Sequence, residues 1–137
     1  MLELFPGDDF VLWSLGCAQV QLQHYPEAIQ TFLKRKVASK ETNWALGCAY
    51  AKAGEIQKAR LVLDFLIDKS KTTYLPNTFI GLVYLSLNEP DKAMAYIEAG
   101  FEQGDNWAVY LEVQPWFDPL RNNTRFQALI SRLRALN

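Results

Sequence analysis

LGCAYAKAGEIQKA, residues 46–59, has the pattern of a helix, a turn and the start of a second helix. Its apolar residues recur at i, i+3 and i+4 until Gly54, which ends the first helix. A glycine inside a helix, such as Gly47, costs roughly 1 kcal/mol relative to alanine. We therefore expect Gly47 to allow a close approach between the two helices, with Ala59 as its neighbour on the second helix.

The same arrangement occurs three times along the chain. Each of three glycines is followed by an alanine 12 residues later, and successive glycines are 31 and 34 residues apart. Equal spacings at a nearly fixed period indicate a repeat, in which each glycine lies at a packed contact between helices. The expected packing pairs are Gly16 with Ala28, Gly47 with Ala59, and Gly81 with Ala93.

The pattern resembles the tetratricopeptide repeat, which has a period of about 34 residues and the elements Leu-Gly, a later tyrosine and a later alanine. Tyr50 and Tyr84 occupy the tyrosine position, whereas the first copy has Gln19. The resemblance implies an all-α fold, a right-handed α-solenoid of three helical hairpins with a helical C-terminal cap. We expect a leader over residues 1–8, repeats over about 9–39, 40–73 and 74–104, and capping helices over 105–137.

Capping residues and apolar periodicity predict the individual helices. We expect a first helix over about 9–22 and a fifth over about 76–87, and Ser39 is the expected N-cap of the third helix. Trp107, in a sequence without a further Leu-Gly pair, is expected in a short seventh helix. His24 is expected in a turn, with no role as a ligand or a catalyst.

The period ends after residue 104, and the segment that follows is expected to cap the repeats. Asp118 followed by Pro119 predicts an N-cap with proline at the first helical position, and Asn123 predicts the N-cap of the last helix. We also expect a buried ion pair between Asp118 and Arg121 that fixes the cap. The expected capping residues are Phe117, Asp118, Pro119, Leu120, Arg121, Arg125 and Phe126.

FDPLR at residues 117–121, followed by Arg125 and Phe126, resembles the closing segment of tetratricopeptide arrays in bacterial multidomain regulators. Those proteins often carry a winged-helix DNA-binding, nucleotide-cyclase or protein-kinase domain ahead of the repeats. Residues 122–124 depart from the acidic, proline-containing turn that is usual there. The resemblance implies a regulatory domain of a larger bacterial protein.

Tetratricopeptide arrays bind partners in a concave groove formed by the first helix of each hairpin, and the resemblance implies such a groove here. Two tryptophans stand four residues before the two cysteines, so both pairs share a helical face. An exposed aromatic stripe would anchor an apolar or amphipathic segment of a protein or peptide partner. The alternative is that both tryptophans are core residues. The expected groove residues are Trp13, Cys17, Val20, Trp44, Cys48, Ala51, Thr78, Leu82 and Leu85.

Composition excludes several other classes of function. The 137 residues have a formal net charge of −1, which disfavours direct nucleic-acid or membrane-surface binding. The two cysteines do not form a Cys-x-x-Cys pair, and no phosphate loop or nucleophile motif occurs. Lys34, Arg35 and Lys36 are expected to be a solvated helix end. We therefore expect no enzyme activity, no metal and no cofactor, and a cytoplasmic location because no signal peptide is evident.

Two other classes of function remain open. The chain could be a structural domain whose groove is filled by its own residues or by a second copy, which predicts a homodimer or a covered Trp13. It could also be a small-molecule sensor attached to a DNA-binding or catalytic domain, which predicts a closed pocket.

Overall fold

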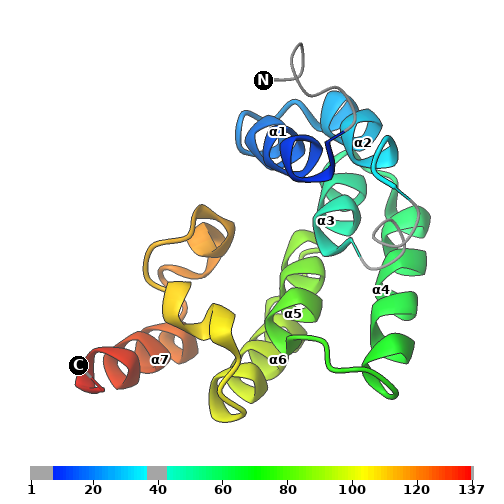
Figure 1. Cartoon of the computed structure of the whole chain (residues 1–137). Helices are drawn as coiled ribbons and strands as arrows, with labels where there is room; N and C mark the ends of the chain where they lie inside the picture. Colours follow the sequence, from blue (N-terminus) through cyan, green and yellow to red (C-terminus); the bar gives the residue numbers. More distant parts are fainter. Residues whose placement is uncertain (1–7, 37–42, 137) are drawn as a thin grey trace.

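A computed structural model describes residues 8–36 and 43–136 as an all-α chain without strands in those ranges. Within these ranges, six α-helices form three consecutive hairpins, and two short 3-10 helices and one α-helix follow them (Figure 1). The hairpins are α1 (Asp9–Gln21) with α2 (Tyr25–Leu33), α3 (Trp44–Lys52) with α4 (Ile56–Ser70), and α5 (Asn77–Ser86) with α6 (Pro90–Glu102). The C-terminal elements are η2 (Asn106–Tyr110), η3 (Pro115–Leu120) and α7 (Thr124–Ala135).

The turn inside each hairpin has the same backbone conformation. Gln23, Gly54 and Asn88 have φ angles of 63°, 85° and 61°, in the left-handed region. These three turn residues are 31 and 34 residues apart, the same spacing as the helical glycines. A left-handed residue just after a helix ends it and reverses the chain, and Gly54 adopts that conformation without steric cost. The repeat therefore extends to the backbone geometry of the turns.

The helix ends agree with the sequence in part. The helix expected over 9–22 is α1, and Asn123 caps α7 as predicted, its Oδ1 accepting a hydrogen bond from the Phe126 amide at 3.1 Å. Ser39 lies outside the described residues, and the N-cap of α3 is Asn43, which accepts from the Leu46 amide at 3.1 Å.

The prediction of an N-cap at Asp118 is wrong. Asp118 and Pro119 lie inside η3, which begins one turn earlier with Pro115 at its first position. The buried ion pair is also wrong, because the Asp118 side chain is 66% exposed and its oxygen lies 3.3 Å from Arg121 Nε. Arg121 instead donates hydrogen bonds to the carbonyl oxygens of Leu111 at 2.7 Å and Gln114 at 2.8 Å, which fixes the chain between η2 and η3.

The three glycines of the repeat pattern lie at close contacts between helices. A Cβ atom at Gly47 would lie 2.9 Å from Val62 of α4, and one at Gly16 would lie 2.3 Å from the Phe32 ring of α2. A Cβ at Gly81 would lie 2.8 Å from Ile97 and 3.0 Å from the Ala93 carbonyl oxygen. The side chains that fill the space at the glycines are thus about one turn beyond the expected alanines. Those alanines, Ala28, Ala59 and Ala93, are fully buried.

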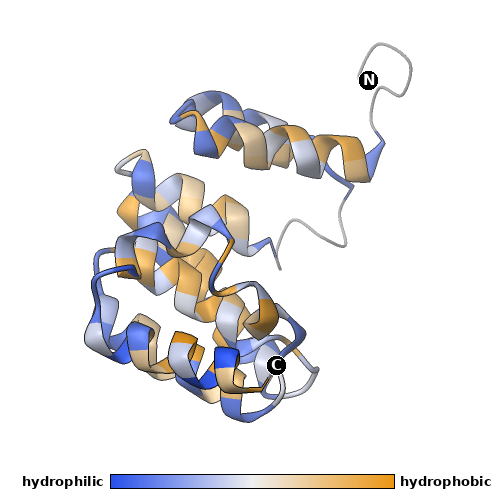
Figure 2. Cartoon of the chain, turned by 90° about the vertical axis from the view of Figure 1, so that its left-hand side faces the viewer, coloured by the Kyte–Doolittle hydropathy of each residue, from blue (hydrophilic) through white to orange (hydrophobic). Residues whose placement is uncertain are grey.

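The hairpins stack side by side, and α2 and α4 lie away from the C-terminal elements (Figure 1). In the last hairpin, α5 contacts η3, and α6 contacts η2 and α7. Hydrophobic and hydrophilic stretches alternate along the helices, as expected for helices that bury one face (Figure 2). Asp105 connects the last hairpin to the C-terminal elements, because its buried carboxylate accepts hydrogen bonds from the amides of Thr78 in α5 and Trp107 in η2. The C-terminal elements are therefore attached to both helices of the last hairpin.

Candidate protein-interaction groove

Five aromatic rings from five different elements meet on the face formed by α1, α3 and α5. Trp44 of α3 is at the centre, and its ring centroid lies 5.6 Å from Trp13, 5.2 Å from Phe79, 5.4 Å from Trp107 and 4.8 Å from Trp116. The ring of Phe79 is stacked on Trp44, and the other three meet it edge to face. These are the favourable geometries of aromatic pairs. We call this set the aromatic cluster.

The C-terminal elements supply two members of this cluster. Trp107 comes from η2 and Trp116 from η3, so the chain folds back onto the face formed by α1, α3 and α5. Trp44 is consequently only 3% exposed. In this structure Trp44 is a core residue, as in the alternative considered from the sequence. Trp13 is half-buried and keeps part of its ring at the surface.

Most of the other expected groove residues are also inaccessible. Cys48 and Thr78 have no exposed surface, and Leu82 is 1% exposed, because α3 and α5 pack directly on each other. Cys17 is half-buried. The accessible part of the predicted groove is therefore limited mainly to Trp13 and Cys17. Buried with the first group are Val20, Ala51 and Leu85.

The two cysteines have raised thiol pKa values. Burial raises the pKa of the Cys48 thiol to about 12, and the thiol donates a hydrogen bond to the Leu82 carbonyl oxygen at 3.4 Å. Burial likewise raises the pKa of Cys17 to about 12. Both thiols are therefore protonated at neutral pH.

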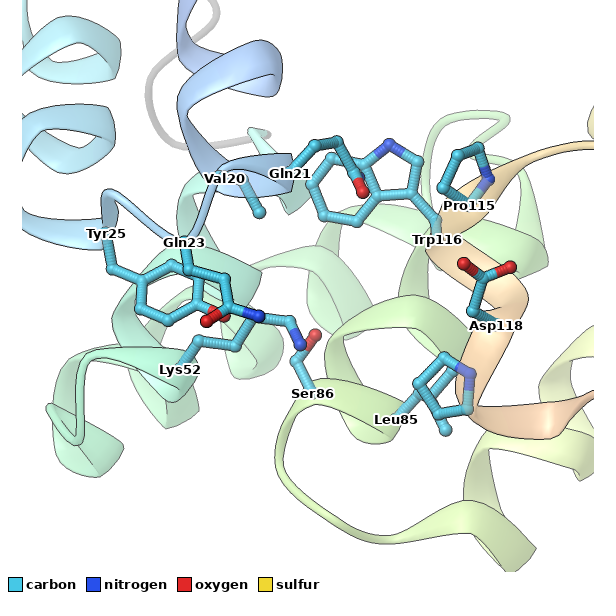
Figure 3. A pocket seen from close by; sticks show the side chains of 11 residues that line it. Val20, Gln21, Gln23, Tyr25, Lys52, Leu85, Ser86, Pro115, Trp116 and Asp118 are labelled. Carbon is cyan, nitrogen blue, oxygen red and sulfur yellow. The ribbon is translucent and has the colours of Figure 1, made fainter.

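One end of the face is an inner pocket of about 270 Å³ under the C-terminal elements. Pro115, Trp116 and Asp118 of η3 stand opposite Tyr25 and Lys52 from the hairpins (Figure 3). The helices α1, α3 and α5 all end at this pocket, where the last residues Gln21, Lys52 and Ser86 line it. The inner pocket is therefore closed on one side by residues of the same chain.

The other end of the face is open and lies where α1, α3 and α5 begin. This space of about 650 Å³, which we call the aromatic mouth, is bordered by four rings of the cluster and by three polar side chains. Phe10 stands at its edge and is 71% exposed. The mouth is lined by Asp9, Phe10, Trp13, Arg35, Asn43, Trp44, Phe79 and Trp107.

The charges at the mouth cancel. Arg35 donates two hydrogen bonds to Asp9, from Nε at 3.2 Å and from Nη2 at 2.6 Å, and these bonds lower the pKa of the Asp9 carboxyl below its usual value. The guanidinium of Arg35 lies 5.0 Å from the centre of the Trp13 ring, a cation–π distance. The Arg35 side chain is only 12% exposed, so the expectation of a solvated helix end is wrong for this residue. Among the described residues that line the mouth, Asp9 and Arg35 are the charged ones, and their charges cancel.

Sequence reasoning missed several residues of this site. Phe79 follows the expected groove residue Thr78, and Trp116 lies next to the expected cap residue Phe117. Arg35 was assigned to the solvent because three cations in a row are usually exposed. Trp107 was expected in a short helix, and η2 is a 3-10 helix whose position over α3 depends on the tertiary fold.

Three stacked helical hairpins with a helical C-terminal cap define an α-solenoid of the helical-hairpin class. A scan against known protein families matches residues 77–102 to the family described as tetratricopeptide repeat. These residues span α5 and α6, so the third hairpin is a tetratricopeptide repeat. No curated protein and no solved structure matched the chain in two further comparisons.

The tetratricopeptide repeat is a non-catalytic fold that binds other polypeptides. The matched hairpin is thus of a protein-interaction type. Among residues 8–36 and 43–136, no group of three or more His, Cys, Asp or Glu side chains could hold a metal ion. A search of the same ranges finds no helix that is long and apolar enough to cross a membrane.

Proposed function

We propose that this chain is a protein-interaction module that binds an apolar or amphipathic segment of a partner at the aromatic mouth. The observation that supports this proposal is the open space around Trp13, which is lined by aromatic rings and has the exposed Phe10 at its edge. Aromatic side chains at an accessible concavity are the usual anchors of peptide recognition. In this proposal Trp13 and Phe10 contact the partner, whereas Trp44 supports the rings from beneath.

A selection from a display library of random 12-residue peptides tests this proposal. The immobilised baits are the wild type, Phe10→Ala and Leu22→Ala. Leu22 is a matched control, because it is 65% exposed and lies at the opposite end of the same helix. We expect synthetic copies of the selected peptides to bind the wild type and Leu22→Ala equally and Phe10→Ala more weakly. Equal binding to all three proteins, or the selection of no peptide, would refute the proposal.

A second candidate function is a structural domain whose groove is filled within its own chain. The seating of Trp116 on Trp44, at 4.8 Å between ring centroids, favours it. Self-association into a homodimer is its other form. Sedimentation equilibrium over a hundredfold concentration range tests that form, since a concentration-independent monomer mass excludes the homodimer.

The proposal places the module in a cytoplasmic bacterial regulator, as a domain of a longer protein. Support comes from the FDPLR segment at residues 117–121, whose Arg121 holds the carbonyl oxygens of the C-terminal cap. Such a domain would couple partner binding to the activity of a neighbouring domain. The gene sequence around this chain tests the placement, and a gene that encodes no further domain would refute it.

A further inference from the structure

We infer that the aromatic mouth takes an uncharged aromatic side chain from an extended segment of the partner. This inference rests on the proposed function, and it specifies the chemistry of the ligand. Three features support it: the aromatic side chains that already pack on the neighbouring surface, the pairing of opposite charges at the mouth, and a buried hydrogen-bond donor that lacks an acceptor among the described residues.

The chain itself shows which side chain this surface accommodates. Trp116 enters from η3 and places its ring edge to face against Trp44, at an interplanar angle of 71°. Trp107 meets Trp44 edge to face at an interplanar angle of 79°, and it meets Phe79 edge to face at 78°. The rings of Trp107, Trp44 and Phe79 all border the mouth. A further ring can continue this arrangement, because each edge-to-face pair contributes favourably beyond the burial of its area.

The charges at the mouth disfavour both kinds of charged ligand. A cationic side chain that approached Trp13 would meet Arg35, which already lies over that ring. A carboxylate would need an unpaired cation, but the guanidinium of Arg35 already donates two hydrogen bonds to Asp9. A charged side chain at Trp13 would therefore lose its hydration without gaining an unpaired opposite charge, whereas a neutral ring has little hydration to lose.

Asn43 offers a hydrogen bond to the main chain of the entering segment. The residue is 2% exposed and lines the mouth, and its Oδ1 accepts from the Leu46 amide. Its Nδ2 is covered and has no acceptor within residues 8–36 and 43–136. Leaving a buried donor unpaired is unfavourable, and a backbone carbonyl oxygen of the ligand would remove that cost after a small side-chain shift, as interfaces commonly show.

Four pentapeptide probes test the inference by NMR. Each is acetylated and amidated, with the sequence Gly-Ala-X-Ala-Gly and X as Phe, Leu, Lys or Glu. The four tryptophans give four indole N–H signals, which are assigned with single Trp→Phe variants. We expect the Phe probe to shift the signals of Trp13 and Trp107, and to bind about two- to tenfold more tightly than the Leu probe. Equal affinity of the Phe and Leu probes, or tighter binding of the Lys or Glu probe, would overturn the inference.

A charge variant tests the same inference independently. Asp9→Asn leaves Arg35 without its counter-ion, so the Glu probe should bind this variant about two- to fivefold more tightly than it binds the wild type. Asp91→Asn is the control, because Asp91 is exposed in the first turn of α6. An unchanged affinity of the Glu probe for Asp9→Asn would refute the role of the Asp9–Arg35 pair.

The outcomes separate the inference from the proposed function. If library peptides bind through Phe10 but show no preference for an aromatic residue, the inference fails and the proposed function stands. If neither the library nor the probes yield binding at the mouth, both fail.

Discussion

Gly47 is the residue on which the closest helix packing of the second hairpin depends. A Cβ atom there would lie 2.9 Å from Val62 and 3.3 Å from Val83, so a larger side chain would force α3 away from α4 or α5. We expect Gly47→Leu to lower the free energy of unfolding by roughly 1 to 3 kcal/mol, as overpacking of a filled core does. Urea denaturation measures the change. Ala95→Leu on the exposed face of α6 is the control, and equal stability of the two variants would contradict the packing argument.

Asn123 caps α7 through a single side-chain hydrogen bond. Its Oδ1 accepts from the Phe126 amide at 3.1 Å, and the loss of such a cap costs about 1 kcal/mol. We expect Asn123→Ala to lower the thermal midpoint of unfolding, whereas Asn122→Ala should not, because Asn122 is exposed and precedes the cap. A differential scanning experiment in which both variants melt together would remove the capping role.

Cys48 provides a test of burial that depends on pH. Its pKa is raised from the ordinary value of 9.0 to about 12, so at pH 8.5 the folded protein holds it as a thiol, while the unfolded chain ionises it in part. The folded state thus loses stability as the pH rises from about 9 toward 12. In a Cys17→Ser background we expect iodoacetamide to modify Cys48 at least about a hundredfold more slowly in buffer than in denaturant. Similar rates would show that Cys48 is accessible.

At the scale of elements, the guanidinium of Arg121 links the segments of the C-terminal cap to one another. Arg121 joins the carbonyl oxygens of Leu111 and Gln114 and lies 5.5 Å from the Phe126 ring, so it connects η2, η3 and α7. Lysine cannot reproduce this fork. We expect Arg121→Lys to reduce the free energy of unfolding by about 1 to 3 kcal/mol.

Asp118→Ala separates this role from the exposed ion pair. An exposed pair contributes at most about 1 kcal/mol, so Asp118→Ala should have a smaller effect than Arg121→Lys in the same urea titration. The reverse order would mean that the ion pair, and not the carbonyl contacts, holds the cap.

At the scale of the whole molecule, the three hairpins differ in how many neighbours support them. In a solenoid each repeat is stabilised mainly by the repeats beside it. The first hairpin contacts the others chiefly through α2 on α3 and Trp13 on Trp44, whereas α5 contacts α3, α4, α6 and η3. We expect amide hydrogen exchange to be fastest in α1 and α2 and slowest in α5. Uniform protection of all three hairpins would show instead that the chain opens only as a unit.

The features that the sequence predicted well are the local ones. The start of α1, the cap at Asn123 and the positions of Gly16, Gly47 and Gly81 follow from steric and hydrogen-bonding rules that operate over a few residues. The N-cap predicted at Asp118 was wrong because the rule behind it, a proline at the first helical position, is local and fits more than one site. Two prolines offered two possible helix starts, and the start at Pro115 is the one that brings Trp116 onto Trp44.

By itself, the sequence determined the repeat: the period of the glycines, the reversal of the chain after each first helix and the class of fold. These properties depend on backbone conformation and on the spacing of apolar side chains, and the local order of residues specifies both. The tertiary structure alone decided how much of the groove stays open. That depends on contacts between residues far apart in sequence, where η2 and η3 bring Trp107 and Trp116 onto α3 and where Arg35 reaches Asp9 at the start of α1.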